Sequence, residues 1–206
     1  NVVKNRAGQF HRASAGAIVW QQNHHVAVNY AIQAFSRLNL PVQLCADITA
    51  AEYGKLLLNL NNALNAISDL PLLQQLLDRK WRLLLAAAMQ EWLHICHKAG
   101  VKPLAYTMLP NALLPWLLRF PTALFRRAAA SMLAIDEHAR SSMSDDIRSH
   151  KRTEIMFLNG AVVRMAQLHQ TTAPVNSVLV EQIKRLECGD AALSVDELLR
   201  QAGLRA

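Results

Sequence analysis

The chain is organised around the stretch Glu52-Tyr53-Gly54-Lys55-Leu56-Leu57-Leu58-Asn59-Leu60-Asn61-Asn62, in which one lysine lies inside a leucine-rich helical pattern. At about 100° per residue, Asn59 lies one turn beyond Lys55 and Asn62 two turns beyond it, so the three side chains project from nearly the same face. One ammonium flanked by carboxamides suits a polar anionic or carbonyl-bearing small molecule. The spacing is equally compatible with a lysine that reaches into water and asparagines that face solvent.

The composition predicts a globular protein with a sizeable core. Of the 206 residues, 52% are hydrophobic and 18% are charged, which argues against disorder. The longest apolar run, Leu83 to Met89, is far shorter than the roughly 20 residues of a membrane span, and residues 1–11 lack the apolar segment of a secretory signal. Three cysteines, an odd number, predict reduced thiols and therefore a cytoplasmic protein without a membrane partner.

Basic residues are in excess, with a formal net charge of +7. Nucleic acid would be one reason for this excess, but no block of five or more Lys or Arg residues is present. An anionic small ligand, such as a phosphorylated cofactor, explains part of the charge equally well. The charge by itself leaves both explanations open.

The first 46 residues differ in pattern from the rest. The expected elements are strands at residues 1–3, 17–20 and 41–45 and a helix from His24 to Leu38, with breaks at Gly8 and Gly16. Strands around one helix look like the end of an α/β domain. So few residues cannot form an independent sheet domain of any size.

From residue 47 onward the pattern is helical, so the fold is expected to be mainly α. Thr49 is a candidate N-cap for the helix of Lys55, because Glu52 follows three residues later as in a capping box. A second long helix is expected from Pro71 to Ala99, where apolar residues recur with the period of a buried helix face. Four prolines between residues 103 and 121 break the next segment into short pieces. Further helices are expected at residues 122–133, 154–170, 176–187 and 195–201.

A second concentration of polar residues occupies positions 140–155. The pair Ser141-Ser142 is a good helix start, because serine hydroxyls cap free backbone N–H groups, and a helix N-terminus also favours a bound carboxylate or phosphate. Thr153 is expected to cap the helix that Glu154 opens. Two ordinary caps and a solvated run of charges would explain the same residues.

His94, Cys96 and His97 are the residues that invite a metal interpretation. Two histidines three residues apart on a helix can share a metal, but no carboxylate or further cysteine lies at a recognisable ligand spacing, and structural zinc takes four ligands. No metal site is therefore expected. The sequence also contains no G-x-S-x-G, H-E-x-x-H or P-loop pattern, and no G-x-G-x-x-G loop for a dinucleotide.

Several stretches form an ordered set along the chain. They are Gly8-Gln9-Phe10-His11-Arg12 through Gly16, Gly54-Lys55-Leu56-Leu57-Leu58-Asn59, Ser141-Ser142-Met143 with Asp146, Thr153-Glu154-Ile155, Leu158-Asn159-Gly160-Ala161-Val162-Val163-Arg164 and Ala173-Pro174-Val175-Asn176. Taken together, they resemble the C-terminal two-thirds of the ketopantoate reductase (2-dehydropantoate 2-reductase) family. The similarity spans nearly the whole chain, in the right order and at natural distances.

In that family an N-terminal Rossmann domain binds NADPH, and a helical domain of the 6-phosphogluconate dehydrogenase C-terminal type closes over the substrate. The resemblance implies that residues 1–46 are the last strands and helix of the NADP-binding Rossmann-like domain, and that residues 47–206 are the helical substrate-binding and catalytic domain. The glycine-rich loop would lie upstream of Asn1, so the chain would be a fragment that binds NADPH poorly alone. Its partners would be a 2-keto acid and NADPH, with a homodimer left open.

The resemblance also implies roles for single residues. Lys55 matches the catalytic lysine of the family, whose ammonium would polarise the 2-keto oxygen and donate a proton as general acid. Asn59 matches a substrate-binding asparagine and Ser142 a substrate-binding serine. Glu154 matches a glutamate that contacts the nicotinamide ribose side of the site.

Two positions depart from the family pattern. The family commonly has a second asparagine eight residues beyond the lysine, where this chain has Ala63, and Asn62 is the candidate to replace it. A further substrate asparagine is expected just past Pro71, where this chain has Leu72 and Leu73. The substrate is therefore open among 2-keto acids.

The predicted function is an NADPH-dependent 2-keto acid reductase, most simply ketopantoate reductase of coenzyme A and pantothenate biosynthesis. The alternative is a non-catalytic helical interaction or dimerisation domain. The combination of Lys55, Asn59, Ser142 and Glu154 favours the reductase, since a packing module has no need of such a polar set. A nucleic-acid-binding module is the weakest reading, because aromatic and basic residues do not alternate.

Overall fold

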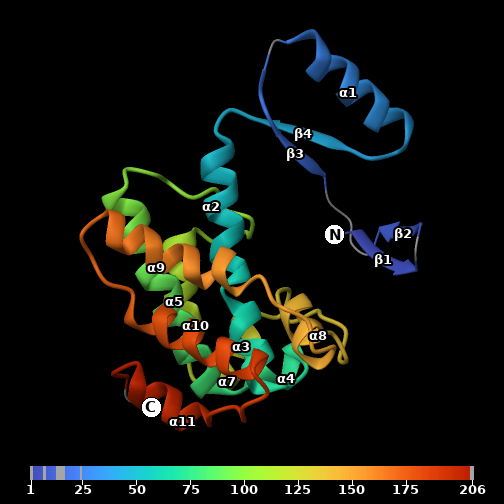
Figure 1. The fold of residues 1–206 in the computed structure, drawn as a ribbon. Coiled ribbons are helices and arrows are strands. Elements are labelled where there is room, and N and C mark those ends of the chain that lie inside the picture. Colours follow the sequence, from blue (N-terminus) through green and yellow to red (C-terminus); the bar gives the residue numbers. More distant parts are fainter. Residues whose placement is uncertain (1, 7, 13–16, 24, 205–206) are drawn as a thin grey trace. The chain divides into compact units, whose positions relative to one another are not determined.

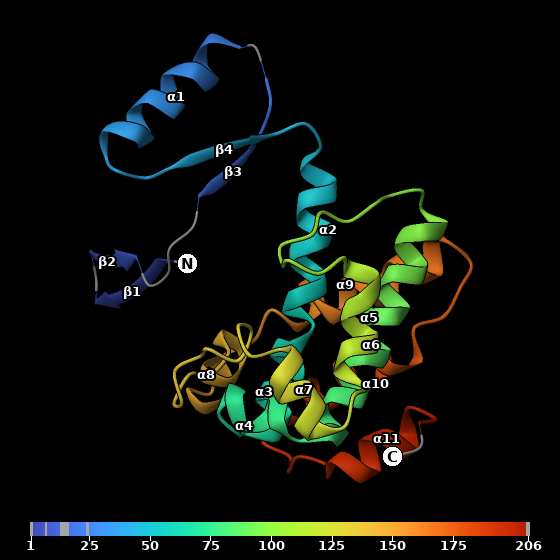
Figure 2. The ribbon, with the colours of Figure 1, turned by 180° about the vertical axis from the view of Figure 1, so that it is seen from behind.

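The structure is a computed structural model that describes residues 2–6, 8–12, 17–23 and 25–204. The chain divides into two compact units, Asn1–Ala51 and Glu52–Ala206. Figure 1 shows the ribbon, and Figure 2 shows it from behind. The strand start expected at Asn1 and the break expected at Gly16 lie outside the described residues.

The first unit contains two small two-stranded sheets. Its elements are β1 (Val2–Arg6), β2 (Gln9–Arg12), β3 (Ile18–Gln21), α1 (Val26–Arg37) and β4 (Val42–Cys45). Strands β1 and β2 pair antiparallel, whereas β3 and β4 are parallel and are joined through α1, as parallel neighbours require. Trp20 of β3 and Phe35 of α1 have ring centroids 6.2 Å apart, so the helix packs on the strand. The expected β-α-β order is observed, and β2 is an additional strand.

The second unit is helical. Its elements are α2 (Ile48–Asn59), which starts at the end of the first unit, then α3 (Asn61–Ser68), α4 (Leu72–Leu77), α5 (Arg79–Lys98), the 3₁₀ turn η1 (Asn111–Leu113), α6 (Leu114–Leu118), α7 (Thr122–Ala128), α8 (Ser142–Arg148), the 3₁₀ turn η2 (Ile155–Phe157), α9 (Asn159–Leu168), α10 (Pro174–Glu187) and α11 (Val195–Gln201). The mainly helical fold predicted from the sequence is confirmed. Within the described part of the chain, no helix is long and apolar enough to cross a lipid bilayer.

Helix α5 is the centre of the second unit. Helices α3, α4, α6, α9, α10 and α11 all pack against it. Figure 1 shows α9 and α10 on its near side, and the reverse view in Figure 2 shows α6 on the other. Leu84, Ala88, Trp92 and Ile95 are completely buried along this helix. A helix that is apolar around most of its circumference is expected to lie inside a domain, and α5 does.

One charged residue, Arg82 of α5, is buried in this core with 0% of its surface exposed. Its guanidinium donates hydrogen bonds of 3.0–3.2 Å to the carbonyl oxygens of Leu76, Leu118 and Phe120 and to Thr122 Oγ1. The guanidinium also lies 4.2 Å from the centroid of the Phe125 ring. Burial lowers the pKa of Arg82. Carbonyls at the C-terminal ends of α4 and α6, which carry partial negative charge, stabilise the cation in place of a carboxylate.

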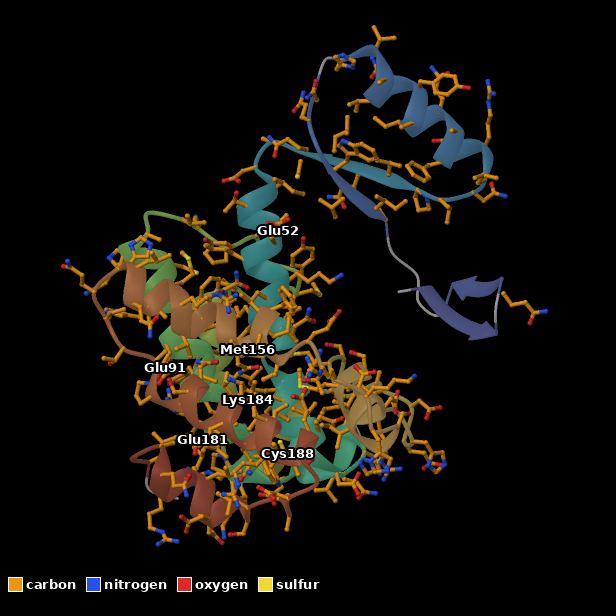
Figure 3. The ribbon with its side chains drawn as sticks, in the orientation of Figure 1. Glu52, Glu91, Met156, Glu181, Lys184 and Cys188 are labelled. Atoms are coloured by element: carbon orange, nitrogen blue, oxygen red, sulfur yellow. The ribbon has the colours of Figure 1, made fainter. Side chains whose placement is uncertain are left out.

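The N-terminus of α10 is attached to α5 by one carboxylate. Glu91, labelled in Figure 3, lies on α5. It accepts hydrogen bonds from the backbone N–H groups of Val175 at 2.8 Å and of Asn176 at 3.0 Å, and from the Asn176 side-chain amide at 2.7 Å. Burial raises the pKa of Glu91, and the hydrogen bonds from Asn176 and Val175 act in the opposite direction. Pro174 opens the helix, a position that does not need a backbone N–H. The order Ala173-Pro174-Val175-Asn176 thus encodes a helix start that docks on α5.

Some helix boundaries differ from those expected. The helix predicted from Pro71 to Ala99 is divided into α4 and α5, because Asp78 has extended backbone (φ −81°, ψ 120°) and its carboxylate caps the Lys80 N–H at 2.8 Å. The helices expected at 122–133 and 154–170 are shorter, since α7 ends at Ala128 and α9 follows a 3₁₀ turn. Helix α11 has the expected bounds.

The start of α2 is also different. The helix begins at Ile48, and Asp47 Oδ1 accepts the Ala50 N–H at 3.1 Å. The capping box predicted from Thr49 and Glu52 is wrong, because both residues already lie inside the helix. An aspartate caps a helix as well as a threonine does, so the error shifts the start by two residues and leaves the face that carries Lys55 unchanged.

Candidate active site

The stretch 52–62 forms one nearly continuous helical rod. Helix α2 ends at Asn59 and α3 begins two residues later, with Leu60 between them in α-helical conformation (φ −58°, ψ −23°). Leu60 is completely buried, whereas Lys55 is exposed and Asn59 and Asn62 are half-buried. The helical register therefore keeps Lys55, Asn59 and Asn62 on one face, opposite the leucines that anchor the rod.

The polar groups on this face are available for a ligand. Within the described ranges, neither the Lys55 ammonium nor the side-chain amides of Asn59 and Asn62 have a hydrogen-bond or ion-pair partner. An ammonium donates three hydrogen bonds, and a carboxamide both donates and accepts. Such a set can bind a carbonyl oxygen and a neighbouring carboxylate or hydroxyl group.

Gly54 brings a loop into backbone contact with α2 immediately before Lys55. A Cβ atom at position 54 would lie 2.0 Å from the carbonyl oxygen of Leu104, so only glycine allows this approach. Asn111 Nδ2 donates to the same carbonyl at 3.2 Å and to that of Pro103 at 2.9 Å. The loop is therefore held beside Lys55 from two sides.

We expect Gly54→Ala to lower the free energy of unfolding by about 1–3 kcal/mol, because the methyl group forces α2 and the Leu104 backbone apart. Chemical denaturation of the two proteins measures this difference. The control is Ala99→Gly at the half-buried C-terminal end of α5, which measures the ordinary effect of exchanging alanine and glycine. Gly189 is unsuitable as a control, because its φ of 89° makes any alanine there strained. Equal stability of Gly54→Ala and the parent protein would contradict the close contact.

Tyr53 fixes α2 against two other helices. Trp92 Nε1 donates to the Tyr53 carbonyl oxygen at 3.0 Å, and the two rings lie 4.7 Å apart between centroids. The Tyr53 hydroxyl is 3.9 Å from Met165 Sδ. Burial raises the pKa of Tyr53, so its hydroxyl stays protonated as a donor at neutral pH. The residue two positions before Lys55 is thus anchored to α5 and α9.

Buried amides lie beneath the rod, and sequence reasoning did not single them out. Asn61 and Gln75 exchange two hydrogen bonds, of 2.8 and 3.3 Å, between their side-chain amides. Asn65 and Gln75 are completely buried, and the Asn65 amide donates to the Gln75 side-chain oxygen at 3.4 Å. The sequence could have pointed to these residues, because an amide at a buried position of a helical pattern needs hydrogen-bond partners from other segments.

The same amides attach the segment before α8 to α3. Asn65 Oδ1 accepts the Ser141 N–H at 2.8 Å, and Ser141 Oγ donates to the Asn62 carbonyl oxygen at 3.2 Å. Ser141 Oγ also accepts the Ser144 N–H at 3.2 Å, which confirms Ser141 as the N-cap of α8. Ser142 is the first residue of α8 and is exposed, with its hydroxyl unpartnered among the described residues.

Ion pairs hold both ends of α8 near the end of α3. Asp69 closes α3 in left-handed conformation (φ 50°), and its Oδ1 lies 3.1 Å from Arg140 Nη1 and 2.8 Å from Arg148 Nη2. Arg140 precedes the cap of α8 and Arg148 ends the helix. One carboxylate thus fixes the orientation of the helix that begins with Ser142.

Glu154 lies immediately before η2. Its neighbour Thr153 is held by Glu187, whose Oε1 accepts both the Thr153 N–H and hydroxyl at 2.7 Å. Its other neighbour, Ile155, is buried and donates its N–H to Thr153 Oγ1 at 3.2 Å. Glu154 is the N-cap residue of a 3₁₀ turn, where a longer helix capped by Thr153 was expected. The Glu154 side chain is exposed, and its carboxylate has no partner among the described residues.

The structure brings together some of the predicted site residues. Lys55 and Asn59 share one helix, and Ser141, the residue before Ser142, donates a hydrogen bond to the Asn62 carbonyl oxygen. No contact described in the structure ties Glu154 to these four residues. The supporting roles of Gly54 and Asn65 were not predicted from the sequence, because the residues that they contact lie far away along the chain.

The residues considered for a metal do not converge. His94 and His97 are exposed on α5, and Cys96 is buried, which raises its pKa to about 12. A thiol that holds its proton so tightly is a poor metal ligand. In the described part of the chain, no three His, Cys, Asp or Glu side chains are placed to hold one ion.

Known proteins share both the sequence and the fold. Residues 47–187 match the family model described as Ketopantoate reductase PanE/ApbA C terminal. The chain is 30% identical over 135 residues to the 2-dehydropantoate 2-reductase of Vibrio cholerae serotype O1, an alignment that covers 62% of this chain and 46% of that protein. The chain thus spans about half the length of this relative.

Two solved structures extend the likeness to the fold. A PanE/ApbA family ketopantoate reductase from Ralstonia eutropha JMP134 superposes with a TM-score of 0.72 at 26% identity, covering 92% of this chain and 57% of that one. D-mandelate dehydrogenase, in a ternary structure with NADH and anilino(oxo)acetate, gives a TM-score of 0.71 at 18% identity, covering 92% of this chain and 58% of that one. The second likeness concerns the fold alone.

Proposed function

This chain belongs to the ketopantoate reductase family, and on that basis we propose that it contributes the substrate-binding and catalytic residues of an NADPH-dependent 2-keto acid reductase. The simplest substrate is 2-dehydropantoate, which would be reduced to pantoate. The observation that carries the proposal is the exposed Lys55, whose ammonium is unpartnered in the described structure and shares a helix face with two asparagines.

Lys55 acts as the general acid. Its ammonium hydrogen-bonds the 2-keto oxygen and withdraws electron density from the carbonyl carbon. As that carbon gains a hydride and the C=O double bond becomes a single bond, Lys55 donates a proton to the oxygen, which leaves a 2-hydroxy acid and a neutral amine. A proton from solvent restores the ammonium. The exposure of Lys55 gives it access to that proton.

Asn59, Asn62 and Ser142 bind the substrate. Their side chains offer amide and hydroxyl donors without partners in the described structure, which suits the carboxylate and hydroxyl oxygens of a small acid. The hydrogen bonds that Ser141 makes to α3 fix the spacing between Asn62 and Ser142. Positioning groups on rigid helices hold the keto carbon in a reactive orientation.

NADPH supplies the hydride when it is bound. Glu154 fits the ribose side of such a cofactor, since its exposed carboxylate can accept hydrogen bonds from hydroxyl groups and its neighbours Thr153 and Ile155 are fixed. The β3-α1-β4 unit is of the kind found in dinucleotide-binding folds. Both observations support a nicotinamide nucleotide as cofactor.

The amide pattern bears on the choice of substrate. Ala63 is completely buried, so a side chain at this position would not reach a ligand on the Lys55 face, whereas the half-buried Asn62 can. Leu72 and Leu73 are half-buried and supply no polar group. A substrate with fewer hydroxyl groups than 2-dehydropantoate would fit this set as well.

A spectrophotometric assay of NADPH oxidation with a panel of 2-keto acids tests the proposal. The protein is expressed from its complete open reading frame, and 2-dehydropantoate is compared with 2-keto acids that carry a branched, an aromatic or no side chain. Turnover of 2-dehydropantoate supports the specific assignment, and preference for another member keeps the reaction and changes the substrate. NADPH binding without turnover of any member would favour the non-catalytic interaction domain.

A further inference from the structure

A cavity of about 130 Å³ lies within the helical unit, and none of the residues proposed for substrate or cofactor lines it. Helices α2 to α7 and the segment after α7 contribute its walls. Among the described residues the lining is apolar except for Asn61. Leu85 and Phe125 form part of its buried side, and Leu58, Met132 and Leu133 are only half-buried, so the cavity reaches solvent on their side.

The walls are held apart by polar contacts outside the cavity. Arg82 does not line it, but its guanidinium binds the carbonyl oxygens of Leu76 and Leu118 and the ring of Phe125, and all three of these residues do. Breaking those contacts would leave a buried cation and its acceptors unpaired. The cavity therefore cannot close by shifting these three walls inward, as an ordinary packing defect would.

The chemistry of the lining defines what can enter. The amide of Asn61 already exchanges two hydrogen bonds with Gln75, and the Arg82 donors are taken by backbone and hydroxyl oxygens. No charged side chain is part of the described lining, and its one amide, that of Asn61, is already bonded to Gln75. A charged group would lose its hydration without gaining a charged partner, whereas an apolar group would gain contacts with the apolar walls.

From these observations we infer that the cavity is a binding site for one compact, uncharged apolar group, an aromatic ring or a branched hydrocarbon. Its volume is close to that of a cavity of about 150 Å³ that binds benzene in another protein. The inference goes beyond the proposed reaction and does not depend on it, because the lining excludes Lys55, Asn59 and Ser142.

Binding of toluene to the full chain tests the site. At about ten times its dissociation constant, toluene is expected to raise the midpoint of thermal unfolding by about 3 °C and to shift the methyl NMR signals of Leu58, Leu85 and Leu133. Benzylammonium, which has a ring of the same size but is charged at neutral pH, is expected to give neither effect. Unchanged methyl signals at saturating toluene would overturn the inference.

Filling the cavity separates this site from general apolar adsorption. Leu85→Phe places a larger side chain in the lining and is expected to abolish the toluene response, whereas Leu168→Phe, on an exposed position outside the lining, keeps it. If Leu85→Phe fails to fold, Met132→Phe at the half-buried rim of the cavity replaces it, and this variant is also expected to lose the toluene response. An equal response in the parent protein and in a folded, filled variant would contradict the assignment.

Discussion

Lys55→Ala is expected to lower kcat by about 10²–10⁴-fold in the protein expressed from its complete open reading frame, because the substitution removes the proton donor for the 2-keto oxygen. Folding should survive, since Lys55 is exposed and has no partner in the described structure. Steady-state NADPH oxidation measures kcat and KM, and circular dichroism checks the fold. A kcat within a few-fold of the parent value would remove Lys55 from the mechanism.

Two further variants sharpen this prediction. Lys184→Ala removes a lysine from the exposed face of α10 (Figure 3) and is expected to leave kcat unchanged, which controls for the loss of one positive charge. Lys55→Arg keeps a cation that can bind the keto oxygen but holds its proton too tightly to donate it. We therefore expect Lys55→Arg to retain KM within a few-fold while kcat stays low.

Arg82→Met is expected to lower the free energy of unfolding by about 3–5 kcal/mol. Methionine fills much of the same space, but it leaves the carbonyl oxygens of Leu76, Leu118 and Phe120 without their donor. These carbonyls come from α4 and from the end of α6 with the residues directly after it, so the loss loosens both segments together. Urea denaturation followed by circular dichroism measures the change.

Arg79→Met is the matched control, because Arg79 belongs to the same helix and is exposed. It is expected to change the free energy of unfolding by about 0.5 kcal/mol or less, as exposed substitutions usually do. Arg82→Lys should rescue only part of the stability, since one ammonium cannot reach three carbonyls and an aromatic face at once. Similar stability of Arg82→Met and Arg79→Met would contradict the structural role of Arg82.

Helix faces, and the N-cap of α8, were predicted well, because they depend on residues close together in the sequence. The 3.6-residue period fixed the face that carries Lys55 and Asn59, and Ser141 is the N-cap that its position indicated. Asp78 shows the limit of such patterns, because the apolar period continues across it. The only local indication of the break between α4 and α5 is that an aspartate can cap a new helix. That indication is weak beside a strong apolar run.

The supporting parts of the candidate site depend on contacts between distant segments. From its local sequence Gly54 is an ordinary helix glycine, and only the structure places the Leu104 carbonyl against it. Arg82 likewise has the local sequence of a surface residue, and only the fold surrounds it with three backbone carbonyls. The sequence contains the polar residues but not their partners. Roles carried by local spacing could therefore be predicted, whereas roles created by tertiary contacts could not.

The central claim is that the residues on the Lys55 face reduce a 2-keto acid with a hydride from NADPH. The most direct measurement uses NADPH deuterated at the reducing carbon of its nicotinamide ring, with product analysis by mass spectrometry. We expect one deuterium at the former keto carbon of a 2-hydroxy acid, formed in a one-to-one ratio with NADP⁺, and we expect Lys55→Ala to form this labelled product about 10²–10⁴-fold more slowly. Oxidation of the cofactor without a deuterated hydroxy acid, or labelled product formed by Lys55→Ala at the rate of the parent protein, would contradict the proposed reaction.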